Sequence, residues 1–236
     1  MTVGFIYPDH AAEDDYPFAA DLLGVHLPVA HVYGTDLHAV PELLDLGSPA
    51  RLAEGARQLE RAQPDAVIWA CTSGSFVFGP DGARAQADAL AAVAGVPASS
   101  TSFAFVHALQ ALGIRRVTVV ASYPTDVATL FGQFLAAAGI EIVSMSSAGI
   151  HTAAEVATLT GDQVLELATD NDHPDAEAML IPDTAMHTLR EVMALEQRIG
   201  RPVLTANQVS VWEGLRLAGL ARSHPRLGRL FRRAVG

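Results

Sequence analysis

The sequence predicts an α/β protein of two similar Rossmann-like lobes, whose parallel sheets are related by pseudo-two-fold symmetry and enclose a candidate active site in the cleft between them. Short apolar runs alternate with longer stretches of helical periodicity, which is the pattern of βαβ units. The segment GVPASSTSFAFVHALQALG, starting at Gly95, is similar to GRPVLTANQVSVWEGLRLA, starting at Gly200. Each gives Gly-x-Pro, a short strand, a polar helix start and an apolar-periodic helix, so the chain is interpreted as an internal duplication.

The expected strands are short apolar runs, at residues 3–7, 25–33, 66–70, 116–122, 141–147 and 178–182. The expected helices lie near residues 49–62, 81–94, 101–112, 125–138, 153–169, 184–199 and 207–219. No long linker or low-complexity segment interrupts them. We expect an N-terminal lobe over 1–113, completed by a C-terminal helix over 207–236, and a C-terminal lobe over 114–206.

Composition indicates a globular protein rather than a membrane or nucleic-acid-binding one. The chain has 236 residues, of which 50% are hydrophobic and 17% charged, with a net charge of −11. No apolar run approaches the roughly 20 residues that cross a bilayer, and the start lacks a signal-peptide pattern. We therefore expect a cytoplasmic protein with no membrane partner. The acidic balance argues against nucleic acid, and the basic tail 226–236 is expected to be a solvated terminal helix.

Missing residue types exclude several chemistries. The sequence has no lysine, which excludes an enzyme that forms a Schiff base on its own lysine. It also lacks a Gly-rich dinucleotide fingerprint and a phosphate loop. One cysteine excludes an internal disulfide and a cysteine-only metal cage. His10 and His187 lack tight ligand spacing, so we expect solvated or hydrogen-bonded roles for them, with no metal and no cofactor.

Two further segments have simple interpretations. The acidic stretch AAEDDYP, residues 11–17, is expected to be a solvated loop near the mouth of the cleft. The methionines expected in the core are Met145, Met179, Met186 and Met193.

Cys71 and Asp183 occupy matching positions in the two predicted lobes. Cys71 follows the strand at 66–70, and Asp183 follows the strand at 178–182. Ligands of open parallel sheets bind beyond the carboxyl ends of the strands. We therefore expect Cys71 on one wall of the cleft and Asp183 on the other.

The residues after Cys71 are suited to binding an anion. Thr72 and Ser73 stand between a strand and helical sequence, where backbone N–H groups are exposed and hydroxyls add donors. A carboxylate is the expected guest, and the same donors are expected to lower the pKa of Cys71. Asp183 could pass a proton if its pKa were raised above the usual ~3.9.

Each candidate also has a structural alternative. A lone cysteine is often simply buried packing. An aspartate before TAMHTLREVM is an ordinary helix N-cap, which applies to Asp183. Tyr123, after VVAS, could be a rim aromatic without ligand contact. The duplication is the observation that favours a site over these readings.

The chain resembles the aspartate/glutamate racemase superfamily, in its maleate cis-trans isomerase and arylmalonate decarboxylase branch. The resemblance is carried by the duplicated lobes and by the motifs CTSGS, GVP, GRP, VVASYPTDV, GLRLAGL and LGRLF. The resemblance covers nearly the whole chain. It implies that a pair of residues, typically two cysteines, faces a small carboxylate between the lobes without metal or cofactor. Carried over by motif, Cys71 is the first-lobe cysteine and Asp183 stands where the second would be. The substrate-binding positions are then Thr72, Ser73, Tyr123 and Thr184.

Departures from the family pattern affect the expected activity. An aspartate in place of the second cysteine puts simple racemisation in doubt. The decarboxylase branch keeps the second-lobe cysteine and lacks the first, the reverse of this chain. Maleate isomerases use the first-lobe cysteine as nucleophile, but usually carry an asparagine after the first strand, which YPDHAAEDD lacks.

The resemblance therefore implies a cofactor-independent isomerase of a small dicarboxylate, either maleate isomerase-like or racemase-like, with Cys71 as nucleophile or base. Two alternatives stay open: an arylmalonate decarboxylase-like lyase, and a non-catalytic carboxylate-binding protein. A homodimer or higher homo-oligomer is expected.

Overall fold

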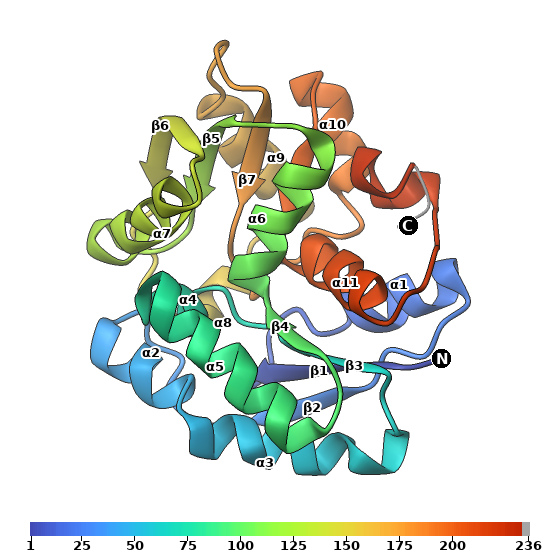
Figure 1. The fold of residues 1–236 in the computed structure, drawn as a ribbon. Helices are drawn as coiled ribbons and strands as arrows, with labels where there is room; N and C mark the ends of the chain where they lie inside the picture. Colours follow the sequence, from blue (N-terminus) through green and yellow to red (C-terminus); the bar gives the residue numbers. More distant parts are fainter. Residues whose placement is uncertain (233–236) are drawn as a thin grey trace.

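The two lobes each contain one all-parallel sheet, and the sheets occupy separate halves of the molecule (Figure 1). The computed structural model describes residues 1–232. The strand order is β2-β1-β3-β4 in the first sheet and β6-β5-β7-β8 in the second. The second half of the chain thus repeats the topology of the first, and the predicted fold class of two similar α/β lobes is confirmed.

The strands are short and mostly buried, as expected for parallel sheets covered on both faces. Those of the first sheet are β1 (Val3–Pro8), β2 (Val29–Val32), β3 (Ala66–Trp69) and β4 (Ala98–Ser100). Those of the second sheet are β5 (Arg116–Ala121), β6 (Glu141–Ser147), β7 (Ala178–Ile181) and β8 (Val203–Thr205).

The helices that connect or follow these strands divide between the two halves of the chain. Within the first half they are α1 (Asp15–Leu23), α2 (Val40–Leu46), α3 (Pro49–Leu59), the 3-10 turn η1 (Glu60–Ala62), α4 (Ser73–Phe76), α5 (Gly79–Ala94) and α6 (Thr101–Leu112). Within the second half they are α7 (Thr125–Ala137), α8 (Ala153–Val156), α9 (Gly161–Asp170), α10 (Val192–Ile199), α11 (Ala206–Leu217), η2 (Pro225–Leu227) and η3 (Arg229–Phe231). No helix among the described residues is long and apolar enough to cross a membrane.

The first sheet lies between α3 on one side and α11 on the other (Figure 1). Alternate residues of β1 show this directly: Gly4 faces Leu59 of α3, whereas Val3 faces Gly214 of α11. Because α11 also packs against α6, β3 and β4, the last long helix of the chain covers the first sheet. The lobe boundaries themselves stay a prediction.

Two predicted helices differ from the structure for local reasons. The predicted helix at 184–199 begins only at Val192, because the N–H groups of Thr188 and Leu189 bond to the Asp15 carboxylate instead of to helix carbonyls. The predicted helix at 153–169 divides into α8 and α9. Thr160 forms a capping box that starts the second of these helices.

Two predictions about exposure are wrong. Residues 11–17 are not a solvated loop, since Asp15 and Tyr16 are buried at the start of α1. Met193 is 51% exposed, while Met179 and Met186 are buried and Met145 is partly buried against the core.

The C-terminal tail is also not a solvated helix over the part that is described. Residues 225–231 form two 3-10 turns with Leu227, Leu230 and Phe231 buried. The carboxylate of Glu196 accepts the Arg229 N–H and fastens this segment to α10. The last part of the predicted tail, residues 233–236, lies outside the described residues.

Candidate active site

A cavity of about 70 Å³ lies where β1, β3 and β7 end, between the two sheets. One water needs roughly 10–15 Å³ on this scale, so the cavity has room for a small organic acid in place of several waters. Its polar lining residues include His38, Cys71, Ser73, Asp183 and Thr184, and its apolar ones include Leu37, Leu43, Leu46, Ala153, Ala154 and Ala185. The structure therefore brings the predicted Cys71 and Asp183 to one cavity.

The Cys71 thiol is buried at the end of β3 and held by its own turn. Its Sγ accepts the N–H of Gly74 at 3.2 Å and lies 3.7 Å from the Ser73 Oγ. A Cβ at position 74 would lie 2.9 Å from the Trp69 ring and 3.1 Å from Sγ, so only glycine allows this close approach. The glycine in CTSGS is thus explained by the position of the sulfur.

Burial raises the pKa of Cys71 to about 11, and the negative charge of Asp183 acts in the same direction. The hydrogen bonds from Gly74 and Ser73 lower the pKa but do not offset burial. The predicted lowering of the Cys71 pKa is therefore wrong, and deprotonation of this thiol needs a base.

Asp183 follows β7 and is 3% exposed. Its Oδ2 accepts a short hydrogen bond from Ser122 Oγ, and its Oδ1 accepts the Ala185 N–H at 2.9 Å. The second bond closes a turn and is not the predicted helix N-cap, because the helix begins only at Val192 with Glu191 as its N-cap. Since the carboxylate also lines the cavity, closure of this turn and contact with a ligand are compatible.

His38 is the residue that sequence reasoning missed. Its Nδ1 bonds to the Ile150 carbonyl oxygen at 3.1 Å, and because a carbonyl only accepts, Nδ1 carries the proton. The Nε2 atom is therefore the one free for proton exchange, and it lies 3.8 Å from Asp183 Oδ2.

The contacts that place His38 come from far along the chain. Leu37 forms an antiparallel bridge with Thr152, and the His38 N–H bonds to the His151 carbonyl at 2.8 Å. The Ala153 N–H bonds to the Asp36 carbonyl at 2.9 Å. Residues 35–38 of the first lobe are thus tied to residues 150–153 of the second, beside the cavity. The local sequence TDLHAV carries no motif that would signal this.

Thr72 and Tyr123 lie behind the cavity lining rather than in it. The Tyr123 hydroxyl donates to the Pro182 carbonyl at 2.8 Å, and the ring packs edge-on against His38 with 4.9 Å between centroids. Thr72 is fully buried, and its Oγ1 has no hydrogen-bond partner within residues 1–232. The ligand contact of Tyr123 stays a prediction; its hydroxyl hydrogen is already donated to the Pro182 carbonyl, so toward a ligand the oxygen could only accept.

Two backbone N–H groups that follow the ends of β3 and β7 are not used in backbone hydrogen bonds. Over the described part of the chain, the N–H groups of Thr72 and Thr184 have no acceptor. Tyr7, which was not predicted, also lines the cavity; its hydroxyl donates to the Thr184 carbonyl at 2.8 Å and accepts the Ala12 N–H at 2.9 Å. Burial raises the pKa of Tyr7 well above its ordinary value, so this hydroxyl stays protonated.

The two histidines named from the sequence lie in different places. His187 pairs with Asp14 at 3.0 Å, away from the cavity lining. The exposed His10 helps to line the cavity.

These features define a class of two-lobed α/β proteins that hold a buried thiol and a carboxylate in one small cavity between parallel sheets. The arylmalonate decarboxylase family matches residues 48–231, and the chain belongs to that family. This confirms the predicted branch of the superfamily.

Two relatives span most of this chain. Arylmalonate decarboxylase of Bordetella bronchiseptica is 28% identical over 242 residues, covering 98% of this chain and 96% of the relative. Maleate isomerase of Nocardia farcinica is 30% identical over 198 residues, covering 78% of this chain and 79% of the relative.

Solved structures agree on the fold. A maleate isomerase variant from Pseudomonas putida S16 with maleate has a TM-score of 0.91 at 21% identity, covering 100% of this chain and 99% of that one. A Nocardia farcinica maleate cis-trans isomerase mutant with a covalently bound succinylcysteine intermediate has a TM-score of 0.87 at 22% identity, with 98% of each chain covered.

Proposed function

We propose that this chain is a cofactor-independent isomerase of a small dicarboxylate, with Cys71 as its nucleophile. The observation that carries the proposal is that one small cavity is lined by the Cys71 thiol and also by Asp183 and His38. A cysteine–succinyl bond in the Nocardia farcinica neighbour supports the same chemistry, since it joins a cysteine sulfur to a four-carbon dicarboxylate in that protein.

In the proposed reaction the Cys71 sulfur adds to an activated C=C bond. The S–C bond forms, and the π electrons move onto the carbon beside the far carboxylate, giving an enediolate-like anion. Rotation about the resulting C–C single bond follows. Elimination then re-forms C=C and returns the electron pair to sulfur, so no proton is gained or lost overall.

The thiol proton must leave before the addition, because burial holds the pKa of Cys71 at about 11. His38 Nε2 is free to take a proton, since Nδ1 is fixed by the Ile150 carbonyl. The neighbouring Asp183 carboxylate would stabilise the resulting imidazolium at 3.8 Å. We assign proton transfer to His38 and charge stabilisation to Asp183.

Carboxylate binding is assigned to neutral donors. Among the described residues no arginine lines the cavity, and lysine is absent from the sequence. The Thr184 N–H and the Ser73 hydroxyl, from residues that line the cavity, are available instead, and the Thr72 N–H lies directly behind the lining. Such fixed donors also stabilise an enediolate without reorganisation. The buried, unpartnered Thr72 Oγ1 would gain a hydrogen bond if a carboxylate displaced its surroundings slightly.

A decarboxylase is the second candidate, favoured by the relative that covers 98% of this chain. The same donors would stabilise the enediolate left by loss of CO2, and Cys71 or the His38–Asp183 pair would supply the proton. The apolar side chains of Leu43 and Leu46 line the cavity and would contact the part of such a substrate that carries no carboxylate.

One NMR experiment separates these reactions. The protein is incubated in D2O with maleate, with a substituted malonate and with aspartate in parallel samples. Conversion of maleate to fumarate supports the isomerase, whereas CO2 loss with deuterium at the α carbon supports the lyase. Exchange of the aspartate α proton would indicate racemisation. Ligand-induced thermal stabilisation without any turnover would support a non-catalytic carboxylate-binding protein and contradict both enzyme proposals.

A further inference from the structure

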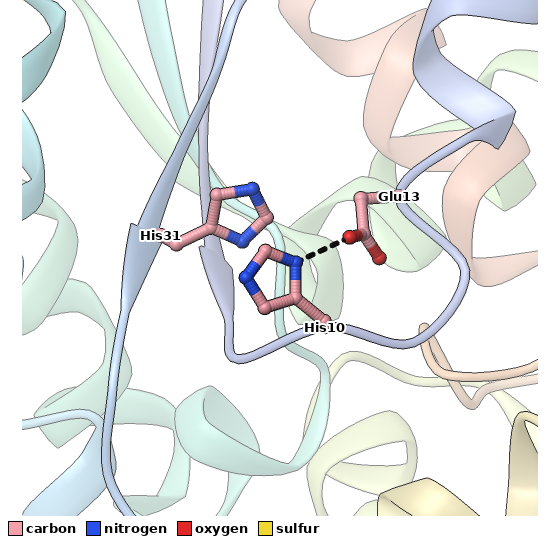
Figure 2. A group of neighbouring side chains, drawn as sticks. All are labelled: His10, Glu13 and His31. Carbon is pink, nitrogen blue, oxygen red and sulfur yellow. Dashed lines mark hydrogen bonds and ion pairs between the residues drawn. The ribbon is translucent and has the colours of Figure 1, made fainter.

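Two histidines and a glutamate meet beside the cavity, which one of them, His10, helps to line, and none of them is used for the chemistry. They are His10, Glu13 and His31, and Figure 2 shows them gathered from the loop after β1 and from β2. One ligand atom of each residue lies within 4.8 Å of the others. The sequence hides this cluster, because His31 is 21 residues from His10 and arrives from the neighbouring strand.

Hydrogen bonds already orient the three side chains. His31 Nδ1 lies 2.6 Å from the Asp9 carbonyl oxygen, so this nitrogen carries the proton and Nε2 keeps its lone pair. A backbone carbonyl on the second ring nitrogen is the usual partner of a metal-ligating histidine. His10 Nδ1 lies 2.6 Å from Glu13 Oε1, and its Nε2 lies 3.3 Å from the Tyr33 hydroxyl.

The charge around the cluster favours a cation. Asp9 and Asp36 line the same cavity as His10, and within residues 1–232 no arginine lines it. A cleft with one sign of charge concentrates ions of the other sign.

We propose that His10, Glu13 and His31 form a binding site for a divalent transition-metal ion, Zn²⁺ by preference, beside the cavity. Two imidazoles and one carboxylate are a common zinc ligand set that leaves a further position for water or a ligand carboxylate. Magnesium and calcium prefer all-oxygen ligands and are not expected to bind here.

Closure onto an ion needs only small movements of exposed groups. Donor atoms around one tetrahedral zinc lie roughly 3.3 Å apart, given Zn–N bonds of about 2.0–2.1 Å. The His10 side chain is 56% exposed, and Tyr33 is 57% exposed, so neither is locked by packing.

The site does not depend on the proposed function. None of its three residues is assigned a role in the thiol chemistry, so zinc binding and turnover are measured separately. Failure of either claim leaves the other standing.

The test is isothermal titration calorimetry of the metal-stripped, untagged chain with ZnCl2 and with MgCl2. We expect one zinc per chain and no magnesium binding. His10→Gln and Glu13→Gln should each weaken zinc binding more than about 10-fold, the smallest loss seen even when only an outer partner of a ligand is changed. Thermal denaturation of each variant confirms that it is folded, and His31→Gln serves as the third ligand variant.

Three control variants address other zinc ligands. His26→Gln removes an exposed histidine outside the cluster, His187→Gln breaks the neighbouring pair with Asp14, and Cys71→Ser removes the thiol. All three should bind zinc like the unchanged chain. Absence of zinc binding, or binding that is lost in a control but kept in folded His10→Gln and Glu13→Gln, would overturn the proposal.

Discussion

His38 Nε2 lies 3.8 Å from Asp183 Oδ2, and both side chains are almost fully buried at one wall of the cavity. The other ring nitrogen of His38, Nδ1, donates a hydrogen bond to the Ile150 carbonyl oxygen. The Asp183 carboxylate accepts hydrogen bonds from the Ser122 hydroxyl and the Ala185 N–H. The pair is therefore oriented from both sides. It occupies the wall where the sequence resemblance leads one to expect a second cysteine.

His38→Gln should lower turnover by about 10²-fold or more, the usual contribution of a positioned acid or base. Glutamine fills similar space but cannot carry the proton. Steady-state kinetics on the substrate found by NMR would measure the loss. His151→Gln, an exposed neighbour, is the matched control and should keep full activity. Equal rates in His38→Gln and the unchanged chain would remove His38 from the mechanism.

Asp183→Asn should lower turnover by roughly 10²–10⁴-fold if the carboxylate manages charge during proton transfer. The asparagine oxygen can still accept the Ala185 N–H, so the turn keeps its cap. A cap alone is worth about 1 kcal/mol of stability, with no effect on rate. Kinetics and melting temperature measured together distinguish the roles: a normal rate with an unchanged melting temperature would leave Asp183 as a cap only.

Chelation should not change the reaction. The proposed chemistry uses only protein groups, and the proposed zinc site lies beside the cavity. Turnover is compared before and after exhaustive treatment with EDTA, with removal of zinc checked by elemental analysis. Activity that disappears with the chelator and returns with zinc or manganese would refute the metal-independent mechanism.

Glu213 gives a pH-dependent prediction about stability. It is buried between α6 and α11, and although burial raises its pKa, hydrogen bonds from His107 and Arg216 hold the pKa at about 2. The usual value of about 4.3 applies in the unfolded chain. The carboxylate therefore contributes stability above that pH, and this contribution is lost as the pH falls toward 2.

Glu213→Gln should accordingly lower the free energy of unfolding by roughly 3 kcal/mol at pH 7, with the difference from the unchanged chain shrinking as the pH is lowered. Urea unfolding at several pH values measures it. Glu54→Gln, at an exposed position, is the control. A difference between Glu213→Gln and the unchanged chain that stays constant from pH 7 to pH 3 would contradict the assignment.

The parts of the fold that the sequence predicts are those that depend on local pattern. The apolar runs before Cys71 and Asp183 mark β3 and β7, and the internal repeat predicts equal strand order in both sheets. These predictions hold because strand identity and strand-end position depend on neighbouring residues. The carboxyl ends of parallel strands then bring Cys71 and Asp183 together without any further information.

What the sequence does not predict depends on contacts between distant segments. His38 reaches the cavity through backbone bonds to Ile150 and His151. Asp15 is buried because it accepts the N–H groups of residues 188 and 189, which also ends the expected helix there. The direction of the Cys71 pKa shift was missed for a similar reason, since burial is a property of the whole fold rather than of the turn.

The central claim, that Cys71 is the nucleophile, is tested most directly by the turnover of Cys71→Ser. A hydroxyl is far less ionised than a thiol and is a weaker nucleophile, so turnover should fall by several orders of magnitude. Ligand binding, measured by thermal shift with the same substrate, should change little because the carboxylate donors are unchanged. Loss of turnover with retained binding is the result we predict, and a fully active Cys71→Ser protein would show that the only cysteine of the chain serves packing alone.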